Sequence, residues 1–374
     1  MSITPQASRK RQAHALFFPA AALYAAITLP ASLQIMLTQP GWLPGLATGL
    51  GHGHEMLFGY ALAVVAGYLL GPQPSLQLYA LFGLWVLARA SYLIAPGSLA
   101  AATLNALFAL LLAMQIAPKF MTAAKKWRNQ AIGPVLLGIC GVAAATQIGR
   151  HLGGYGTQQL LLLEAVLLLA LLMLFMGGRI IAPAVAGQFH KQGMDLEARV
   201  QPRIEGALII AMGAAILLAP LPGAGLATAV ALGAAGVLAA VRLLRWRLWE
   251  LAGRPDLLCL GAGYGWLAIG LLLLAVAAAA DSYRVAALHV ITVGALGSLS
   301  IGIMARVRLQ RNKADPAKST EIVICTVLIG IAAATRLAAG LGIGDSAMLL
   351  WLAALSWALA FLLLARLLYS LRAG

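Results

Sequence analysis

Long apolar blocks recur along the whole chain, and short polar or Pro- and Gly-containing segments separate them. A helix needs about 20 mainly apolar residues to cross a hydrocarbon layer of about 30 Å. The pattern predicts twelve membrane-spanning helices, over residues 15–37, 52–71, 75–95, 98–117, 131–150, 158–179, 204–219, 224–242, 256–280, 284–306, 320–341 and 345–368. The boundary between the seventh and eighth helices depends on Pro220-Leu221-Pro222-Gly223, because Pro and Gly there would end one helix and open the next.

Composition supports this reading of the pattern. Of the 374 residues, 62% are apolar and 10% are charged, whereas a soluble domain is about half apolar and about a quarter charged. The chain is therefore predicted to be an all-α polytopic membrane protein with both termini in the cytoplasm, forming a single membrane domain over residues 1–374. Its longest inner loop, about 180–203, is expected to be a solvated connector.

The net charge of +15 tests the predicted orientation. Alternating the loops from an inner N-terminus places 22 of the 26 Lys and Arg residues at inner ends and four at outer ends, Arg89, Arg150, Arg284 and Arg336. Such a split follows the positive-inside rule, so basic loops explain the charge and nucleic acid is not an expected partner. The opening Arg9-Lys10-Arg11 before an apolar run also fits a cleavable signal peptide, but the length of the run favours a retained helix.

Two other sequence features are interpreted as parts of the helix packing and not as reactive or ligand-binding sites. Cys140, Cys259 and Cys325 each lie in an apolar run without C-x-x-C spacing, which favours packing over a disulfide or a thiolate cluster. Gly261-x-Gly263-x-Gly265 suggests a dinucleotide loop, but it lies inside a predicted apolar helix with no preceding strand.

Ionisable residues gather at one predicted depth. Each costs about 2.5–3.5 kcal/mol inside a membrane on insertion scales, so such residues are candidates for function. The outer half holds four of the six histidines together with carboxylates and arginines: His52, His54, Glu55, Arg89, Arg150, His151, Glu164, Arg284, His289 and Arg336. Histidines from several helices at one depth suit an axially ligated haem, and the four outer arginines suit its propionates. Arginines at helix ends that reach the lipid headgroups are the alternative.

Three features of the outer half allow more than one interpretation. His52-x-His54 at a helix start could bind zinc or copper, or could be an interfacial N-terminal turn. Glu164 could relay protons, support a ligand histidine, or pair with an arginine. Gly294 and Gly297, after His289, could form a helix-packing seam or the floor of a cofactor slot.

Five segments, spread in order over nearly the whole chain, resemble the NnrS family. They are His54-Glu55-Met56-Leu57-Phe58-Gly59-Tyr60, Met176-Gly177-Gly178-Arg179-Ile180-Ile181, Arg242-Leu243-Leu244-Arg245-Trp246-Arg247, Gly263-Tyr264-Gly265-Trp266-Leu267, and His289 to Gly297. The resemblance implies a twelve-span protein of the bacterial inner membrane that carries haem and copper and is associated with denitrification and nitric oxide resistance. The chain differs from the family pattern near Gly261, where the family commonly has a histidine.

The layout also resembles the main subunit of haem-copper oxidases, in which haem-ligating histidines lie on the second and tenth helices, although the oxidase's copper ligands have no counterpart here. We therefore expect haem b near the periplasmic side, with His54 and His289 as the favoured iron ligands and His52 as the substitute for His54. Electron transfer or nitric oxide binding would be the activity, supported by an unidentified redox donor. Copper ligands cannot be assigned. A proton-coupled transporter of a small solute or metal that uses Glu164, and a cofactor-free assembly protein, are the alternatives.

Overall fold

The computed structural model describes residues 10–39, 41–123 and 127–371. Within these ranges eleven helices are long and apolar enough to cross a membrane. A continuous helical run over residues 49–69, divided into three consecutive segments, supplies a twelfth. The predicted all-helical polytopic fold is therefore confirmed. Arg9, Lys125, Lys126 and Arg372, which count toward the predicted inner charges, lie outside the described residues.

The first half of the chain contains two short strands and the helices around them. In order these are β1 (Lys10–Gln12), α1 (His14–Thr38), η1 (Pro44–Leu46), α2 (Gly49–His54), η2 (Glu55–Ala61), α3 (Leu62–Leu69), β2 (Pro72–Pro74), α4 (Ser75–Ile94), α5 (Leu99–Ala123), α6 (Trp127–Gln130), α7 (Ile132–Leu152), α8 (Tyr155–Met176), η3 (Gly177–Ile181) and α9 (Ala182–Lys191). The strands pair antiparallel, with Arg11 opposite Gln73.

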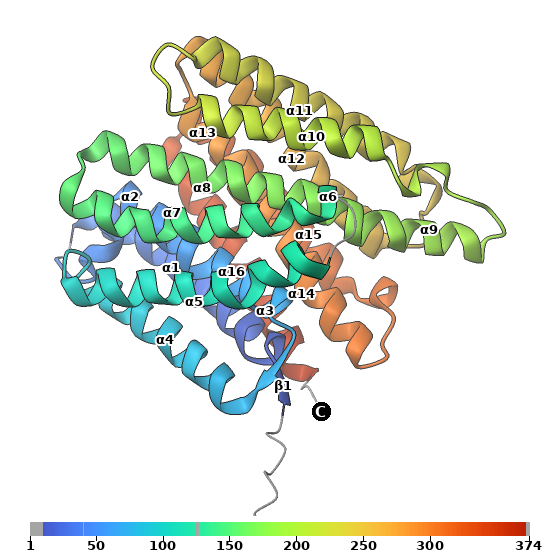
Figure 1. The fold of residues 1–374 in the computed structure, drawn as a ribbon, viewed down its shortest axis with the longest axis horizontal. Helices are drawn as coiled ribbons and strands as arrows, with labels where there is room; N and C mark the ends of the chain where they lie inside the picture. The colour runs from blue at the N-terminus through green and yellow to red at the C-terminus, as the bar shows by residue number, and fades with distance from the viewer. Residues whose placement is uncertain (1–9, 40, 124–126, 372–374) are drawn as a thin grey trace, which may run out of the picture.

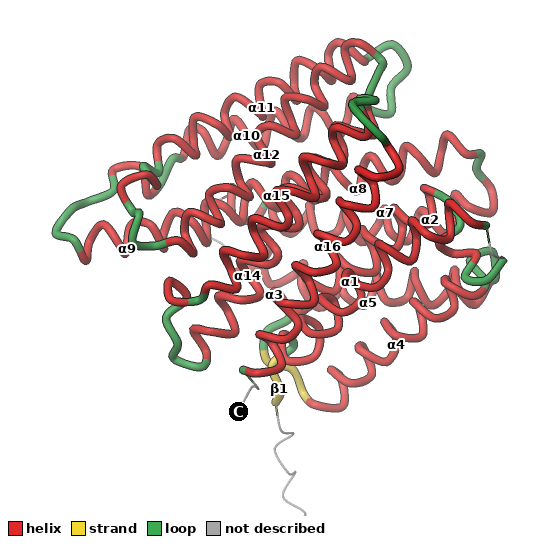
Figure 2. The backbone as a smooth tube through the Cα atoms, turned by 180° about the vertical axis from the view of Figure 1, so that it is seen from behind, coloured by secondary structure: helices red, strands yellow, loops and turns green. Residues whose placement is uncertain are grey.

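In the second half of the chain, every regular element among the described residues is a helix. Its elements are η4 (Glu197–Arg199), α10 (Pro202–Leu218), α11 (Gly225–Arg245), η5 (Leu248–Glu250), α12 (Pro255–Ala280), α13 (Arg284–His289), η6 (Val290–Ala295), α14 (Leu296–Arg311), η7 (Pro316–Lys318), α15 (Thr320–Gly340) and α16 (Ser346–Ser370). The first and last long helices, α1 and α16, pack against each other. The described chain ends, β1 and the end of α16, lie at the same side of the bundle in both views (Figures 1 and 2).

Three helical runs lie at the centre of the bundle and contact one another: α2–η2–α3, α8–η3 and α13–η6–α14. Each contains one π-helical segment, η2, η3 or η6. π-Segments are rare and are frequent at functional sites, because the extra residue re-aims the side chains around it. Here they coincide with three of the five segments that resemble a known family, so the candidate functional site is expected on these central helices.

Several helix boundaries differ from the predicted ones for local reasons. The second span starts at Gly49 because the Thr48 side chain accepts a hydrogen bond from the Gly51 backbone N–H (3.1 Å) and caps the helix. The sixth span continues through η3 and α9 to Lys191, so about half of the expected solvated connector is helix. A π-turn at Gly177–Ile181 keeps the backbone hydrogen-bonded where a helix end was expected.

Candidate functional site

The imidazole rings of His52 on α2 and His289 on α13 lie close together. Their ring centroids are 6.4 Å apart and their planes differ by 10°. Two metal–nitrogen bonds of about 2.0 Å each, together with the radii of the two rings, amount to a similar separation. The spacing therefore suits a metal held between the two imidazoles.

In each imidazole a hydrogen bond engages Nδ1 and thereby leaves Nε2 free. His289 Nδ1–H donates to the Val285 carbonyl oxygen at 2.7 Å. His52 Nδ1 lies 2.8 Å from the Ser32 hydroxyl, which itself donates to the Leu29 carbonyl and so accepts from the imidazole. Both rings thereby keep the Nε2 lone pair for a ligand, as metal-binding histidines do when their second nitrogen is anchored.

Arg336 on α15 is an outer arginine near this pair. Its charge acts on both His52 and His289, and its guanidinium packs against Gly340, where a β-carbon would lie 3.3 Å from Nη1. In the described part of the chain no carboxylate pairs with it. This guanidinium is thus available to an anionic group beside the two imidazoles.

His54 has a different environment and uses both ring nitrogens. Its Nδ1 lies 2.8 Å from Glu55 Oε1, and Gln147 Nε2 lies 2.7 Å from its Nε2. The ring is buried and stacks on Tyr92 at a centroid distance of 3.8 Å. His54 therefore has no free nitrogen in this arrangement, and its ring packs against Phe58 and Tyr92.

Glu55 is the centre of a buried polar network that joins four spans. It accepts hydrogen bonds from Tyr24 on α1 and from Arg89 Nη1 on α4 (2.7 Å), and Arg89 also donates to Asn105 on α5. Removing one member of a buried ion pair leaves the other charge without a partner, at a cost of about 3–5 kcal/mol. Glu55 and Arg89 therefore join the helices to one another rather than facing a cofactor.

Two of the other predicted outer residues, Arg150 and Arg284, contact groups away from the His52–His289 pair. Arg150 donates to the Tyr92 hydroxyl at 2.8 Å and lies over its ring, and Arg284 pairs with Asp281 in solvent. His151 lies near the end of α7, and its side chain is outside those the structure describes.

Glu164 lies on α8 without an ion pair in the described part of the chain. Its Oε1 is buried and has no hydrogen-bond partner. The pairing with an arginine that the sequence allowed is therefore absent among these residues, and the carboxyl group retains an unused oxygen inside the membrane.

The remaining family-like segments meet toward the other end of the bundle. A β-carbon at Gly177 would lie 2.8 Å from Tyr264 Cδ2 and 3.3 Å from Trp246, and one at Gly178 would overlap the Arg242 guanidinium. The two glycines thus allow η3 to approach α11 and α12 at this point. Both glycines let the side chains of Tyr264, Trp246 and Arg242 lie close to the backbone. The sequence alone did not indicate this role.

Gly294 and Gly297 also lie in close packing. β-Carbons there would lie 2.9 Å from Trp266 Cγ and 2.9 Å from Trp357 Cζ3. Of the two readings that the sequence left open, the structure supports the helix-packing seam. Tryptophan rings fill the space that a cofactor slot would need.

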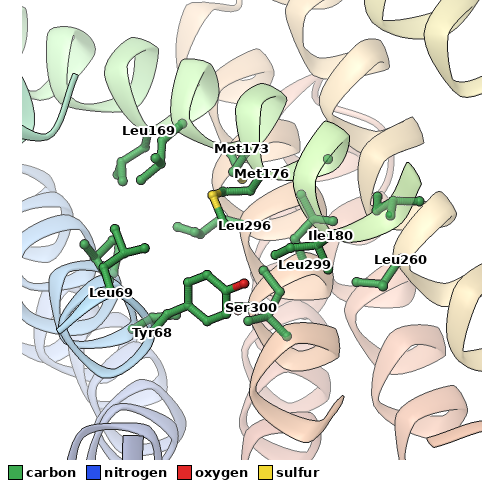
Figure 3. Close-up of a pocket in the computed structure, with 17 residues that line it drawn as sticks. Tyr68, Leu69, Leu169, Met173, Met176, Ile180, Leu260, Leu296, Leu299 and Ser300 are labelled. Carbon is green, nitrogen blue, oxygen red and sulfur yellow. The ribbon is translucent and has the colours of Figure 1, made fainter. Parts of the chain in front are cut away.

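A mainly apolar cavity lies between the three central runs. It encloses about 80 Å³ and is lined by residues of α3, α8, η3, α12 and α14. Figure 3 shows the Tyr68 ring reaching into it from α3, with Met173 and Met176 on the α8 side and Leu296, Leu299 and Ser300 on the α14 side. The cavity offers a small apolar space along the same helices that carry His52 and His289.

Among the described residues, no group of three or more His, Cys, Asp and Glu side chains is placed to hold a metal ion. Cys140, Cys259 and Cys325 are free and buried. The two imidazoles therefore suit a metal group that brings its other ligands with it, as a porphyrin does, better than a closed zinc site, which needs four protein ligands.

Sequence reasoning missed the residues that orient these rings. Ser32 engages Nδ1 of His52, Gln147 engages Nε2 of His54, and Tyr92 stacks on the His54 ring. All three residues lie on helices other than α2. Ser32 and Gln147 are polar residues within predicted apolar spans, which was the available signal.

Comparison with known proteins yields one match. The family model described as "NnrS protein" matches residues 10–371. No curated protein and no solved structure matches the chain.

Proposed function

Since the chain belongs to the NnrS family, we propose that it is a haem-binding protein of the bacterial inner membrane that takes part in the response to nitric oxide. Haem b would be held between the second and tenth spans on the periplasmic side. The proposed activity is electron transfer or nitric oxide binding, with a redox donor as partner. Copper remains part of the family expectation without assigned ligands.

The observation that carries this proposal is the pairing of His52 with His289. Two parallel imidazoles 6.4 Å apart, each with Nδ1 occupied, present two Nε2 donors. We assign these two as the iron ligands, so His52 takes the place that the sequence gave first to His54. Arg336 is the cation available to a propionate.

The protein's own residues would set the properties of the bound group. Haem would supply an iron that takes up an electron or binds nitric oxide when one axial position is free. Ser32 and the Val285 carbonyl hold the imidazoles in one tautomer and orientation. Because the Ser32 hydroxyl and the Val285 carbonyl are uncharged, both imidazoles stay neutral, and each offers its Nε2 lone pair to the metal.

Absorption spectra of purified variants test the assignment. We expect the wild type to show a Soret band that shifts on reduction with dithionite, and His52→Ala or His289→Ala to lose it or shift it. His190→Ala is the matched control, because His190 lies on α9 at the opposite end of the bundle, and it should keep the wild-type spectrum. A Soret band lost in His54→Ala but kept in His52→Ala would overturn our ligand pair. A metal-containing protein without a Soret band would instead indicate a copper ion.

One observation favours a second function. Glu164 has a buried carboxyl oxygen without a partner, as expected of a proton or cation site in a transporter. That function predicts a colourless protein whose substrate flux is lost in Glu164→Gln, whereas a haem protein should keep its spectrum in the same variant.

A further inference from the structure

A second cavity of about 260 Å³ lies beside α8–η3, on the side that carries Gly178 and Arg179. Four arginines from four different elements line it, Arg128, Arg179, Arg199 and Arg242. Glu205 on α10 is the only carboxylate among its lining residues. The described lining therefore carries three uncompensated positive charges.

Glu205 holds two of the arginines. Arg128 Nη1 donates to its Oε2 at 2.5 Å, and Arg242 Nη2 donates to its Oε1 at 2.7 Å. Arg179 and Arg199 have no hydrogen bond or ion pair with another described residue, and both are exposed. Their guanidinium groups are free to bind an anion.

Arg242 is fixed in place while one of its donors stays free. Its side chain is buried, donates from Nη1 to the Leu174 carbonyl at 3.0 Å, and lies over the Trp246 ring. Its Nε is buried without a partner. A buried donor without a partner is costly, so this atom is a second indication of a missing acceptor.

The rest of the cavity wall is apolar and comes from Leu171, Leu174, Phe175, Leu208 and Ile209. Arg128, Arg199 and Arg242 lie in short helices or at a helix end, and Arg179 lies in η3. The apolar side chains lie along α8 and α10, so cation and hydrocarbon surfaces adjoin. Basic pockets between transmembrane helices at the inner boundary bind phosphate-bearing headgroups.

We propose that this cavity binds a phosphate group. Arginine guanidinium suits this ligand because its planar array of donors forms paired, charge-assisted hydrogen bonds with phosphate oxygens. Arg242 and Arg128, oriented by Glu205, form the fixed wall, and Arg179 and Arg199 close on the anion. The group can come from an anionic phospholipid or from a free phosphate compound, and the apolar wall favours the lipid. This site is separate from the two histidines and independent of haem.

Two binding measurements on purified, delipidated protein in neutral detergent test the proposal. In one, phosphatidylglycerol is added and retained lipid is counted by native mass spectrometry. In the other, inorganic phosphate and pyrophosphate are titrated and the shift in unfolding temperature is followed. Because charge-assisted hydrogen bonds contribute about 1.5–3 kcal/mol each, we expect Arg179→Gln with Arg199→Gln to weaken the observed binding at least about tenfold.

Arg245→Gln with Arg311→Gln is the charge-matched control, since both residues are exposed at the ends of α11 and α14 and neither lines the cavity. It should change binding less than about twofold if general surface charge plays no part. Arginine-dependent binding of the lipid alone, or of the free anions, supports the proposal and identifies the source of the phosphate. No binding in either arm, or binding that the cavity double variant and the control double variant lose equally, overturns it.

Discussion

At the scale of single residues, a neighbouring group decides what a side chain can do. His52 and His54 are two positions apart, yet one keeps a free Nε2 and the other has both nitrogens engaged. The same applies to Gly178, whose missing β-carbon leaves room for the ion pair between Arg242 and Glu205. Local sequence gives the residue type, and the contacts give its role.

Gly178→Ala is expected to destabilise the protein. The added β-carbon would lie 3.0 Å from Arg242 Cζ and 3.2 Å from Glu205 Oε1, so the buried pair must shift. Overpacking of this kind costs about 1–3 kcal/mol. Thermal unfolding in detergent measures it, with Gly141→Ala in α7 as control because a β-carbon there meets nothing within 4 Å. Equal stability of the two variants would contradict this role of Gly178.

At the scale of elements, the three π-segments decide where the central helices aim their side chains. η6 follows His289 directly and η2 follows His54, while η3 carries Gly177, Gly178 and Arg179. Each inserts an extra residue into an otherwise α-helical run, which changes the rotation of the preceding turn relative to the next one. The relative orientation of His289 and α14 thus depends on the register within η6.

Deletion of Thr292 should return η6 to a regular α-helix and rotate His289 by about 100° relative to α14. His289 would then leave His52, and we expect the Soret band to disappear while the helical circular dichroism remains. Thr292→Ala is the control, because it removes the side chain and keeps the register. An unchanged Soret band after the deletion would show that η6 does not position His289.

At the scale of the whole molecule, the helices form one bundle whose first and last long helices are joined. The Trp357 indole N–H donates to the Ala25 carbonyl at 3.0 Å, which joins α16 to α1 across 332 positions of the chain. The described ends emerge on the same side (Figures 1 and 2), as an even number of spans requires. Basic residues concentrate at that side in the sequence-based orientation.

Cysteine labelling from outside intact cells checks this orientation. The three native cysteines are buried and give little background. We expect Leu221→Cys, in the exposed loop between α10 and α11, to react with a membrane-impermeant maleimide in intact cells. Asp195→Cys, in the loop after α9, should react only after the membrane is permeabilised. The reverse pattern would place the two imidazoles on the cytoplasmic side.

The sequence by itself determined the number of spans, their approximate bounds and the segments of the family pattern. It could do so because membrane insertion depends on the apolar content of about 20 consecutive residues, which is a local property. It also placed His52, His54 and His289 on the second and tenth helices, as the structure has them.

Only the tertiary structure decided which histidines meet and what the glycines are for. The anchor of His52 lies 20 positions before it in the chain, and the amide that occupies His54 lies 93 positions after it. Helical periodicity cannot relate residues on different helices, because the rotation and depth of each helix come from packing against its neighbours. The arginine-lined cavity has the same origin, since its four cations come from elements that are joined only in the folded bundle.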